Sequence, residues 1–325
     1  MISAKPTLRL GVRNWDHLTP LLVGDVAPQA FDLELSRVEL TPDLNERTDL
    51  DGAEASASHA LLGHANGDRS TIVLPIFVLS AFRQRSFIVR RGSGLSSLGQ
   101  LAGKRVGLTA WADTGNTLSR AVLRAAGVEN DEVEWRIGPM TADAPFSDAS
   151  FRYAPSSVEP SGGPLRELLD AGDLDAVVVS FMPRDGYGSN GSVRRLLLDF
   201  RKQEIDYFRR IALVPGLHVL KLRTEFAERH PEVVAELLSL FAESYERWMA
   251  RRVSLADTTP WLTAELDIVA DTIGLDWSPY SLTSAFATMS MLGRELHEQG
   301  IADSFVGPAE VFGPYLQLTG QAVDE

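Results

Sequence analysis

Short β-rich runs alternate with helix-like segments along the chain, and this alternation limits the possible folds more than any other feature. Residues 8–12 and 31–38 each alternate apolar with polar or small residues, with a Gly24–Asp25 turn before the second run, so both are predicted strands. A helix is predicted between them from about His17. Further strands are predicted at 71–75, 86–90, 105–108 and 174–179. Strands that alternate with helices favour an α/β fold with mainly parallel sheets.

The last third of the chain is predicted to be mostly helical. Pro231 suits a first helical turn, and the amphipathic stretch after it reaches Arg252. Two more helices are expected at about 257–273 and 279–299. Residues 139–163, rich in Ser, Pro, Asp and Ala, are predicted to form a long loop.

The charge balance restricts the partners of the chain. Its 325 residues carry 44 acidic and 31 Lys or Arg side chains, a net charge of -13, which argues against a nucleic-acid partner because such proteins cluster basic residues. A few local arginines are nevertheless enough to bind a small anion. Cysteine is absent, which excludes disulfides, zinc thiolates and cysteine nucleophiles.

The hydropathy pattern gives no sign of a membrane span or of a secretion signal. No window approaches the roughly 20 continuous apolar residues that a spanning helix needs. Residues 1–7 run directly into the first predicted strand, without an apolar core followed by a small-residue cleavage site. We therefore expect a cytoplasmic protein.

A series of sequence words recurs in the same order as in a known family. They are Asp16, Pro20–Leu21 and Gly24, EASAS at 54–58, GDRSTIVLPIF at 67–77, AFRQRSFIVR at 81–90, LGQLAGKRVG at 98–107, Met182–Pro183, VRRL at 193–196, YFRR at 207–210, the strand of His218, and ERHP at 228–231. Through them the chain resembles the 4,5-dihydroxyphthalate decarboxylase family over most of residues 8–250.

The resemblance implies the architecture of type 2 periplasmic-binding proteins, with two α/β lobes joined by two crossovers. One lobe would comprise residues 1–84 and 207–325, and the other residues 85–206. The strand at 86–90 and the segment near Tyr207 would be the hinges. Closure of the cleft between the lobes would remove water from a small anionic ligand and strengthen its polar contacts.

The chain departs from the family pattern where a ligand is expected. After Gly107–Leu108 the family tends to present an acidic and an aromatic residue, whereas this chain has TAWADTGN at 109–116. A tyrosine common after the Ser-x-Ser segment is replaced by His59, and Phe181 precedes Met182. The resemblance therefore supports the fold more firmly than the substrate or the reaction.

Two functions are consistent with these features. The first is a decarboxylase of a hydroxylated aromatic carboxylate, in aromatic catabolism. Such a reaction needs a proton donor for the ring carbon, electron release from a ring hydroxyl and a cationic clamp on the second carboxylate, but no electron-sink cofactor. The alternative is a non-catalytic solute-binding protein for a small anion, favoured by the fold and by the missing acidic residue.

Arginines and a helix start are the candidates for the anion clamp. Arg13 ends the first strand, although it could instead pair with Asp16 at the surface. Arg83 is preferred to Arg85, with one expected to reach the ligand and the other to brace the crossover. The hydroxyls of Ser56 and Ser58 could form an anion site at a helix start or could simply cap that helix.

Histidines are the candidate proton donors. His218 lies in an apolar run, so packing in the core is the alternative to catalysis, and His59 is the competing donor. Asp16 is either an acid that orients the donor or a helix cap. Expected ligand contacts are completed by Trp111, Asp113 and Thr114 as a facing wall from the second lobe, and by Asn14, Phe77, Phe181 and Met182.

Other site classes lack their sequence signatures. The six histidines are scattered, so no metal site is expected. The glycines around residues 103–107 fit neither nucleotide-binding pattern, and no Gly-x-Ser-x-Gly elbow is present. The helical C-terminal third offers surface for a homo-oligomer.

Overall fold

The structure is a computed structural model that describes residues 5–255 and 260–322. The chain divides into two compact units. Unit 1 consists of the described residues of Met1–Ala81, Leu213–Met291 and Val306–Glu325, and unit 2 consists of Phe82–Ala212 and Leu292–Phe305. The sequence analysis assigns residues 292–305 to the same lobe as residues 1–84, whereas in the structure they group with unit 2.

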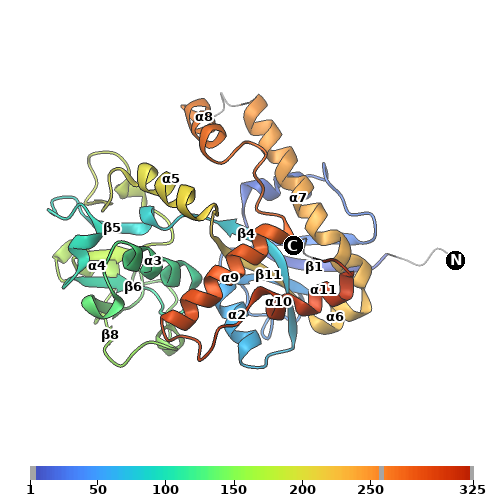
Figure 1. Cartoon of the computed structure of the whole chain (residues 1–325), viewed down its shortest axis with the longest axis horizontal. Coiled ribbons are helices and arrows are strands. Elements are labelled where there is room, and N and C mark those ends of the chain that lie inside the picture. The colour runs from blue at the N-terminus through green and yellow to red at the C-terminus, as the bar shows by residue number, and fades with distance from the viewer. Residues whose placement is uncertain (1–4, 256–259, 323–325) are drawn as a thin grey trace. The chain divides into compact units, whose positions relative to one another are not determined.

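Unit 1 contains a five-stranded sheet in the order β2-β1-β3-β11-β4. Its strands are β1 (Thr7–Arg13), β2 (Asp32–Val38), β3 (Gly52–Ser56), β4 (Thr71–Ser80) and β11 (Gly216–Arg223). Strands β1, β4 and β11 are labelled in Figure 1. β1 runs parallel to β2 and to β3, whereas β11 is antiparallel to both β3 and β4. The sheet is therefore mixed, because β11 enters from the second half of the chain in the opposite direction.

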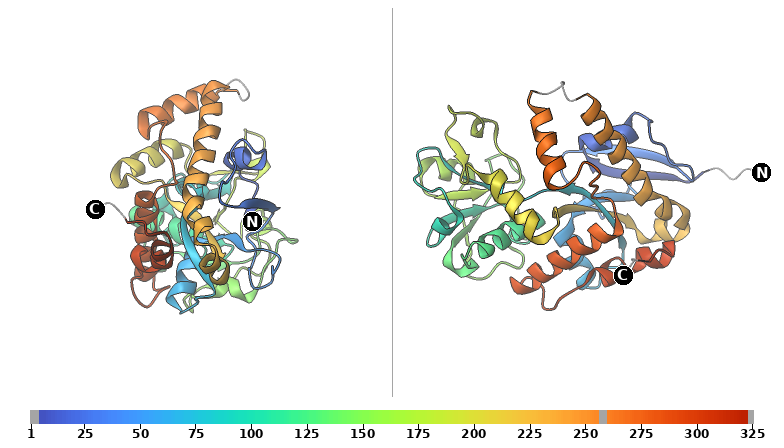
Figure 2. Two further views of the ribbon diagram at one scale, coloured as in Figure 1. Left: turned by 90° about the vertical axis from the view of Figure 1, so that its right-hand side faces the viewer. Right: turned by 45° about the horizontal axis from the view of Figure 1, so that its top comes forward.

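Helices supply the rest of the unit 1 core. The long helix α7 (Pro231–Ser254), the long light-orange helix in both views of Figure 2, contacts η1 (Asp16–Leu18), α1 (Thr19–Leu22), β4 and α11 (Gly313–Thr319). Its buried face joins Leu8, Leu10 and Leu220 in one apolar cluster. The other helices that lie wholly in this unit are α2 (Ala57–Ala65), α6 (Thr224–Arg229), α8 (Leu262–Thr272) and α10 (Pro308–Val311).

Unit 2 contains a six-stranded mixed sheet in the order β10-β5-β9-β6-β7-β8. Its strands are β5 (Phe87–Arg90), β6 (Arg105–Leu108), β7 (Glu134–Ile137), β8 (Glu159–Pro160), β9 (Ala176–Val178) and β10 (Val193–Arg195). β5 is antiparallel to β9 and β10, and the other pairings are parallel. The helices are α3 (Thr114–Ala125), α4 (Leu165–Ala171) and α5 (Phe200–Ile211), and α9 (Leu282–Glu298) begins in unit 1 and ends here.

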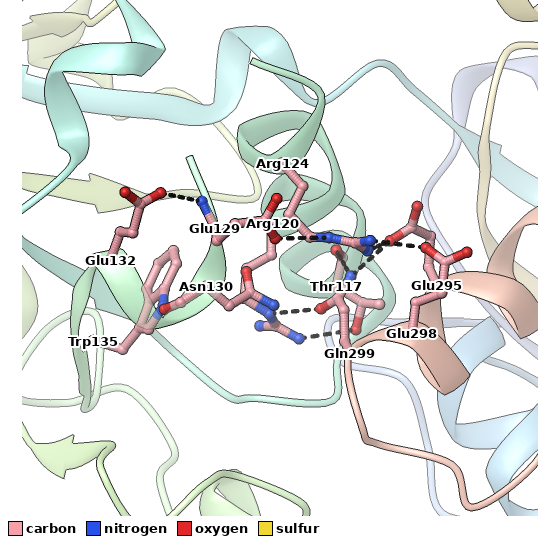
Figure 3. A network of polar contacts seen from close by, with 10 residues as sticks. All are labelled: Thr117, Arg120, Arg124, Glu129, Asn130, Glu132, Trp135, Glu295, Glu298 and Gln299. Carbon is pink, nitrogen blue, oxygen red and sulfur yellow. Dashed lines mark hydrogen bonds and ion pairs between the residues drawn. The ribbon is translucent and has the colours of Figure 1, made fainter. Parts of the chain in front are cut away.

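A polar network fastens the last part of α9 to α3 within unit 2 (Figure 3). Arg120, which is fully buried, donates from Nε to Gln299 Oε1 at 2.8 Å and from Nη2 to the carbonyl oxygen of Trp111 at 2.9 Å. Arg124 donates to Glu295 at 2.9 Å and to Glu298 at 2.8 Å. These contacts explain why residues 292–305 group with unit 2, which the order of residues along the chain does not reveal.

Candidate functional site

One edge of the unit 1 sheet collects the ends of three strands. β1 and β3 are parallel neighbours, so their carboxyl ends at Arg13 and Ser56 lie on the same edge. β11 starts at this edge, and its His218 pairs with Ser56. The carboxyl edge of parallel strands is where open α/β sheets place their ligands.

A fully buried carboxylate lies just inside this edge. Glu54, with no exposed surface, accepts two hydrogen bonds at Oε2, from the backbone N–H of Arg13 at 2.8 Å and from Trp15 Nε1–H at 2.9 Å. Both groups can only donate, so Oε2 must act as an acceptor. A buried charge is tolerated only when its partners replace the lost water, and these donors supply part of that replacement.

His218 completes the partners of Glu54. Its Nδ1 lies 2.5 Å from Glu54 Oε1. His218 pairs with Ser56 across the antiparallel ladder, which makes Glu54, two residues earlier on β3, its diagonal neighbour on the same face of the sheet. The direction of this contact depends on the tautomer of the imidazole, and in the tautomer that carries its proton on Nδ1 the ring donates to Glu54 Oε1. Nε2 is then the ring nitrogen left to meet a substrate.

The imidazole is the part of this pair that reaches the surface. Its side chain is 19% exposed, against 0% for the Glu54 side chain. A group that exchanges protons with a ligand has to be reachable, whereas its orienting carboxylate does not. The pair therefore combines an imidazole that a ligand can reach with a buried carboxyl group that holds the ring in its orientation.

Trp15 connects the pair to a cavity of about 280 Å³, which is lined by Arg13, Asn14, Trp15, Val38 and Glu39. The Trp15 ring meets the His218 ring edge-to-face, with centroids 6.4 Å apart. The Arg13 guanidinium carbon lies 5.2 Å from the centroid of the Trp15 ring. Arg13 is thus the cation of a small cavity that shares a wall with the Glu54–His218 pair.

His17 lies in an aromatic cluster and does not neutralise Glu54. Its Nε2 is 2.7 Å from the hydroxyl oxygen of Tyr280, and its ring packs edge-to-face against Tyr245 and Trp248 at 6.0 Å. Burial lowers the pKa of His17 from 6.5 to about 4, although Asp16 and Glu54 oppose this shift. His17 is therefore neutral at pH 7 and adds no positive charge beside Glu54.

The other candidate site residues of unit 1 lie on a helix start, on the surface and in the core. Ser56 is the N-cap residue of α2, whose first turn contains Ser58, with no exposed surface, and the exposed His59. Asp16 is the first residue of η1, where its exposed carboxylate lies 3.7 Å from Arg252. Phe77 is 2% exposed and fills the space beside Gly216. The structure brings Arg13 and His218 together around Glu54 and Trp15.

Arg83 and Arg85, the two arginines expected near a hinge, are both engaged within unit 2. Arg83, 4% exposed, donates from Nε to the Gly115 carbonyl oxygen at 3.0 Å and from Nη2 to that of Val179 at 3.2 Å. Burial lowers its pKa to about 10, so it remains a cation at pH 7. Arg85 forms a bidentate pair with Glu204, with both distances at 2.8 Å. Both arginines brace unit 2 through these contacts, and a contact of one of them with the ligand stays a prediction.

The three residues expected to form a facing wall, Trp111, Asp113 and Thr114, also lie in unit 2. Trp111 is 1% exposed, packs edge-to-face on Trp135, and has the Arg120 guanidinium carbon 3.9 Å from its ring centroid, so no ring face is left for a ligand in this structure. Asp113 is the N-cap residue of α3, and Thr114 after it is 1% exposed. These residues form the start of a packed helix.

Phe181 lies at a second cavity of about 280 Å³, at the carboxyl ends of the unit 2 strands. Its ring is 53% exposed. Met182 packs on the unit 2 core, where its Sδ and Cε fill the space beside Gly186. The polar side chains of this cavity are Thr109, Thr141, Arg166 and Ser180. Arg166 is already bound to Asp170 and Asp185, so it is poorly placed to bind a further carboxylate.

Sequence reasoning missed two residues of this site, Glu54 and Trp15. Glu54 was part of a family word, but no role was assigned to it. The signal that could have identified it is a single carboxylate in the otherwise small-residue strand GAEAS. Trp15 follows the first predicted strand directly, but sequence alone does not show that its indole N–H points to a residue 39 positions away.

The residues that the structure describes contain no group of three or more His, Cys, Asp or Glu placed to hold a metal ion. No helix among them has the length and apolar character needed to cross a bilayer.

Comparison with known proteins identifies relatives along nearly the whole chain. A 4,5-dihydroxyphthalate decarboxylase of Comamonas testosteroni is 29% identical over 330 residues, which cover 96% of this chain and 97% of the relative. One of Pseudomonas putida is 26% identical over 225 residues, covering 65% of this chain and 85% of the relative. A family model described as NMT1/THI5 like matches residues 65–153. The resemblance to 4,5-dihydroxyphthalate decarboxylases is confirmed.

Solved structures identify the fold. The alkanesulfonate-binding protein SsuA from Xanthomonas axonopodis pv. citri, bound to MOPS, superposes with a TM-score of 0.58 at 14% sequence identity, covering 95% of this chain and 99% of SsuA. This likeness concerns the fold alone. The chain has the predicted two-lobed α/β fold of the periplasmic-binding-protein type, with mixed sheets and a helical C-terminal portion.

Proposed function

We propose that this chain is a decarboxylase of a hydroxylated aromatic acid of the 4,5-dihydroxyphthalate type, with the Glu54–His218 pair as its proton-donating centre. The observation that carries the proposal is the 2.5 Å contact between His218 Nδ1 and a buried carboxylate that two other donors already hold in place. The names of the two relatives supply the reaction and the substrate class.

The reaction needs only a proton from the protein. The imidazolium form of His218 would donate its Nε2 proton to the ring carbon that bears the departing carboxylate, while the hydroxyl para to that carbon releases electrons into the ring. The bond to the carboxylate then breaks, its electron pair restores aromaticity, and CO2 leaves. One proton is consumed, which His218 regains from solvent, and nothing is oxidised or reduced.

Arg13 is the proposed clamp for the carboxylate that stays on the ring. It lines the cavity next to His218 and can bind a carboxylate through two parallel N–H groups. Glu39 in the same lining disfavours an anion on its side of the cavity, so the substrate carboxylate would face Arg13. The expected ligand position between the two lobes stays a prediction.

Turnover is tested by incubating the purified protein with 4,5-dihydroxyphthalate and measuring CO2 release. We expect His218→Gln to lower kcat by about 10²- to 10⁴-fold, the usual contribution of a general acid. His59→Gln is the matched control, because His59 is the other candidate donor and lies exposed on α2; we expect it to keep near-normal activity. Equal losses in both variants, or a loss confined to His59→Gln, would contradict the assignment to His218.

A second candidate function is the binding of a small anion without chemistry. The likeness to SsuA and the missing acidic residue after Leu108 favour it. Calorimetric titration with 4,5-dihydroxyphthalate and phthalate distinguishes the two functions. Tight binding with no CO2 released over hours would support the binding protein and exclude the decarboxylase for that substrate.

A further inference from the structure

The cavity next to the Glu54–His218 pair contains a carboxylate that the proposed proton donation does not involve. Glu39 is exposed and lines this cavity of about 280 Å³, which shares Trp15 with the pair. A carboxylate disfavours an anionic ligand unless that ligand also presents hydrogen-bond donors to it. Glu39 therefore restricts which anions the cavity can bind.

Glu39 and Arg13 come to the same end of the unit 1 sheet. β1 and β2 are parallel, and Arg13, the last residue of β1, pairs with Val38, the last residue of β2. Glu39 follows Val38 directly, and neighbouring strands lie about 4.8 Å apart. The cavity therefore receives its cation from one strand end and its carboxylate from the next.

The remaining lining residues of the cavity are uncharged, and they are Asn14, Trp15 and Val38. The Arg13 guanidinium carbon lies 5.2 Å from the centroid of the Trp15 ring. An aromatic ring whose carboxylate binds to Arg13 would therefore lie close to the indole, and the methyl groups of Val38 add apolar surface. The cavity thus offers a cation, an apolar wall and a carboxylate to one ligand.

An acid of the 4,5-dihydroxyphthalate type has the complementary arrangement. Its carboxylates occupy one edge of the ring, and two neighbouring hydroxyl groups occupy the opposite edge. An ionised carboxylate only accepts hydrogen bonds, and each of its two oxygens can receive one hydroxyl. The carboxylate edge therefore suits Arg13 and the hydroxyl edge suits Glu39. A ring without hydroxyls would displace water from Glu39 and give it no donor in return.

We propose that Glu39 selects ligands with two neighbouring ring hydroxyls and that its contact with them assists the decarboxylation. The proposal rests on the proposed function, from which it takes the reaction and the substrate class. It adds a second residue that touches the substrate, on the side of the ring opposite the carboxylates.

The contact with Glu39 strengthens as the reaction proceeds. When His218 donates its proton to the ring carbon, the ring gains positive charge and the hydroxyl para to that carbon becomes a stronger donor. Its hydrogen bond to Glu39 is then stronger than in the ground state, which lowers the barrier. The hydroxyl keeps its proton, and the ring returns to its former charge when CO2 leaves, so Glu39 is unchanged at the end.

The binding test uses 3,4-dihydroxybenzoate, which is the product expected from 4,5-dihydroxyphthalate and keeps one carboxylate and both hydroxyls. In calorimetric titrations it should bind at least about tenfold more tightly than 3,4-dimethoxybenzoate, whose ether oxygens cannot donate. In methyl NMR of the full chain labelled at valine, the signals of Val38 should shift on titration with 3,4-dihydroxybenzoate.

Two variants test the part of Glu39. Glu39→Gln leaves a single acceptor oxygen, so the preference for the dihydroxy ligand should fall by about fivefold or more, and kcat for 4,5-dihydroxyphthalate by about tenfold or more. Glu34→Gln is the matched control, because it removes an exposed carboxylate from the same strand outside the cavity lining. It should keep both the preference and kcat.

The outcomes distinguish this proposal from the decarboxylase function. If CO2 is released and Glu39→Gln keeps the full preference, or if the Val38 signals do not move, the assignment to Glu39 is overturned and the decarboxylase stands. If Glu39→Gln loses the preference but keeps kcat, its part in the reaction is overturned. A preference that depends on Glu39 without any CO2 release would support the contact and contradict the decarboxylase, and no binding at all would contradict both.

Discussion

Glu54 is a fully buried acidic side chain. The partners of its two carboxyl oxygens explain how unit 1 tolerates this burial. Two donors fix Oε2, and this leaves Oε1 to fix the ring of His218. The carboxylate does not reach the surface, so any effect on a substrate must pass through the imidazole. Glu54 is accordingly the proposed positioning residue, and His218 is the proposed catalytic residue.

Glu54→Gln is expected to separate kcat from KM. The amide can no longer accept from all three donors, so the imidazole loses its fixed orientation and kcat should fall by about 10²-fold or more. KM should change by less than about threefold, because Glu54 does not touch the substrate. Steady-state kinetics measure both constants. In NMR, the far-downfield signal expected for the Nδ1 proton of His218 should disappear.

Two variants control this prediction. Glu54→Asp keeps the carboxylate and should retain more activity than Glu54→Gln if both remain folded by circular dichroism. Glu39→Gln changes an exposed carboxylate of the neighbouring cavity and should leave the Nδ1 signal in place. A Glu54→Gln variant with normal kcat would show that the pair does not serve the reaction.

His17 should make unit 1 less stable in mild acid. Its pKa is about 4 in the folded chain and 6.5 when exposed, so the unfolded chain binds the proton more readily between these values. The stabilisation is complete above pH 6.5 and is lost as the pH falls toward 4, at a cost of the order of 3 kcal/mol. Urea unfolding at pH 7 and pH 4.5 measures the change, and it should be smaller in His17→Gln. Equal pH dependence in both proteins would refute the assignment.

At the scale of elements, helix α3 shows how a segment remote in sequence becomes part of a unit. Arg120 in its second turn and Arg124 in its last turn contact Glu295 and Glu298 at the end of α9 and Gln299 directly after it (Figure 3). Arg120 is also fully buried and stacks on Trp111. Burial lowers its pKa to about 9, so the guanidinium stays charged at neutral pH and depends on these contacts.

Arg120→Ala should therefore lower the free energy of unfolding by about 2–4 kcal/mol. The change opens space over Trp111 and leaves the Gln299 oxygen and the Trp111 carbonyl without their donor. Arg184→Ala, at an exposed position of the same unit, is the matched control and should stay within about 0.5 kcal/mol of the unchanged chain. Chemical denaturation followed by tryptophan fluorescence measures both. A loss below 1 kcal/mol in Arg120→Ala would show that the network adds little to unit 2.

At the scale of the whole molecule, the two units have separate apolar cores and the chain carries a net charge of -13. The proposed dianionic aromatic substrate would therefore be repelled at long range and attracted close to Arg13. The repulsion and the attraction act over different distances. The screening length shortens from roughly 30 Å at 0.01 M salt to about 8 Å at 0.15 M, which weakens the long-range repulsion. Direct contacts extend over only a few ångströms and are screened less.

Salt should consequently strengthen the binding of a dianion to this acidic protein. We expect the affinity for phthalate to rise, by up to about tenfold, between 0.01 and 0.15 M sodium chloride, because the long-range repulsion is screened first. For benzoate, which has one carboxylate, the logarithm of the affinity should change about half as much over the same salt range. Calorimetric titration at several salt concentrations tests this. Affinity that falls with salt for both ligands would mean that local arginine contacts dominate.

The sequence by itself determined the features that depend on neighbouring residues. Alternation at 8–12 and 31–38 predicted β1 and β2, and the amphipathic pattern after Pro231 predicted α7, which ends two residues beyond the expected Arg252. These patterns are readable because side-chain direction repeats every two residues in a strand and every 3.6 in a helix. The ordered family words added the fold, and the comparisons confirmed it.

Tertiary structure alone decided which of these elements meet. The small residues of GAEAS give little strand signal, and β3 forms because β1 and β11 provide a pairing partner on each side. The register of β3 with β11 sets Glu54 beside His218, 164 residues later. Packing on α3 buried Trp111 and drew residues 292–305 into unit 2. Such contacts join residues far apart in the chain, and no local periodicity encodes them.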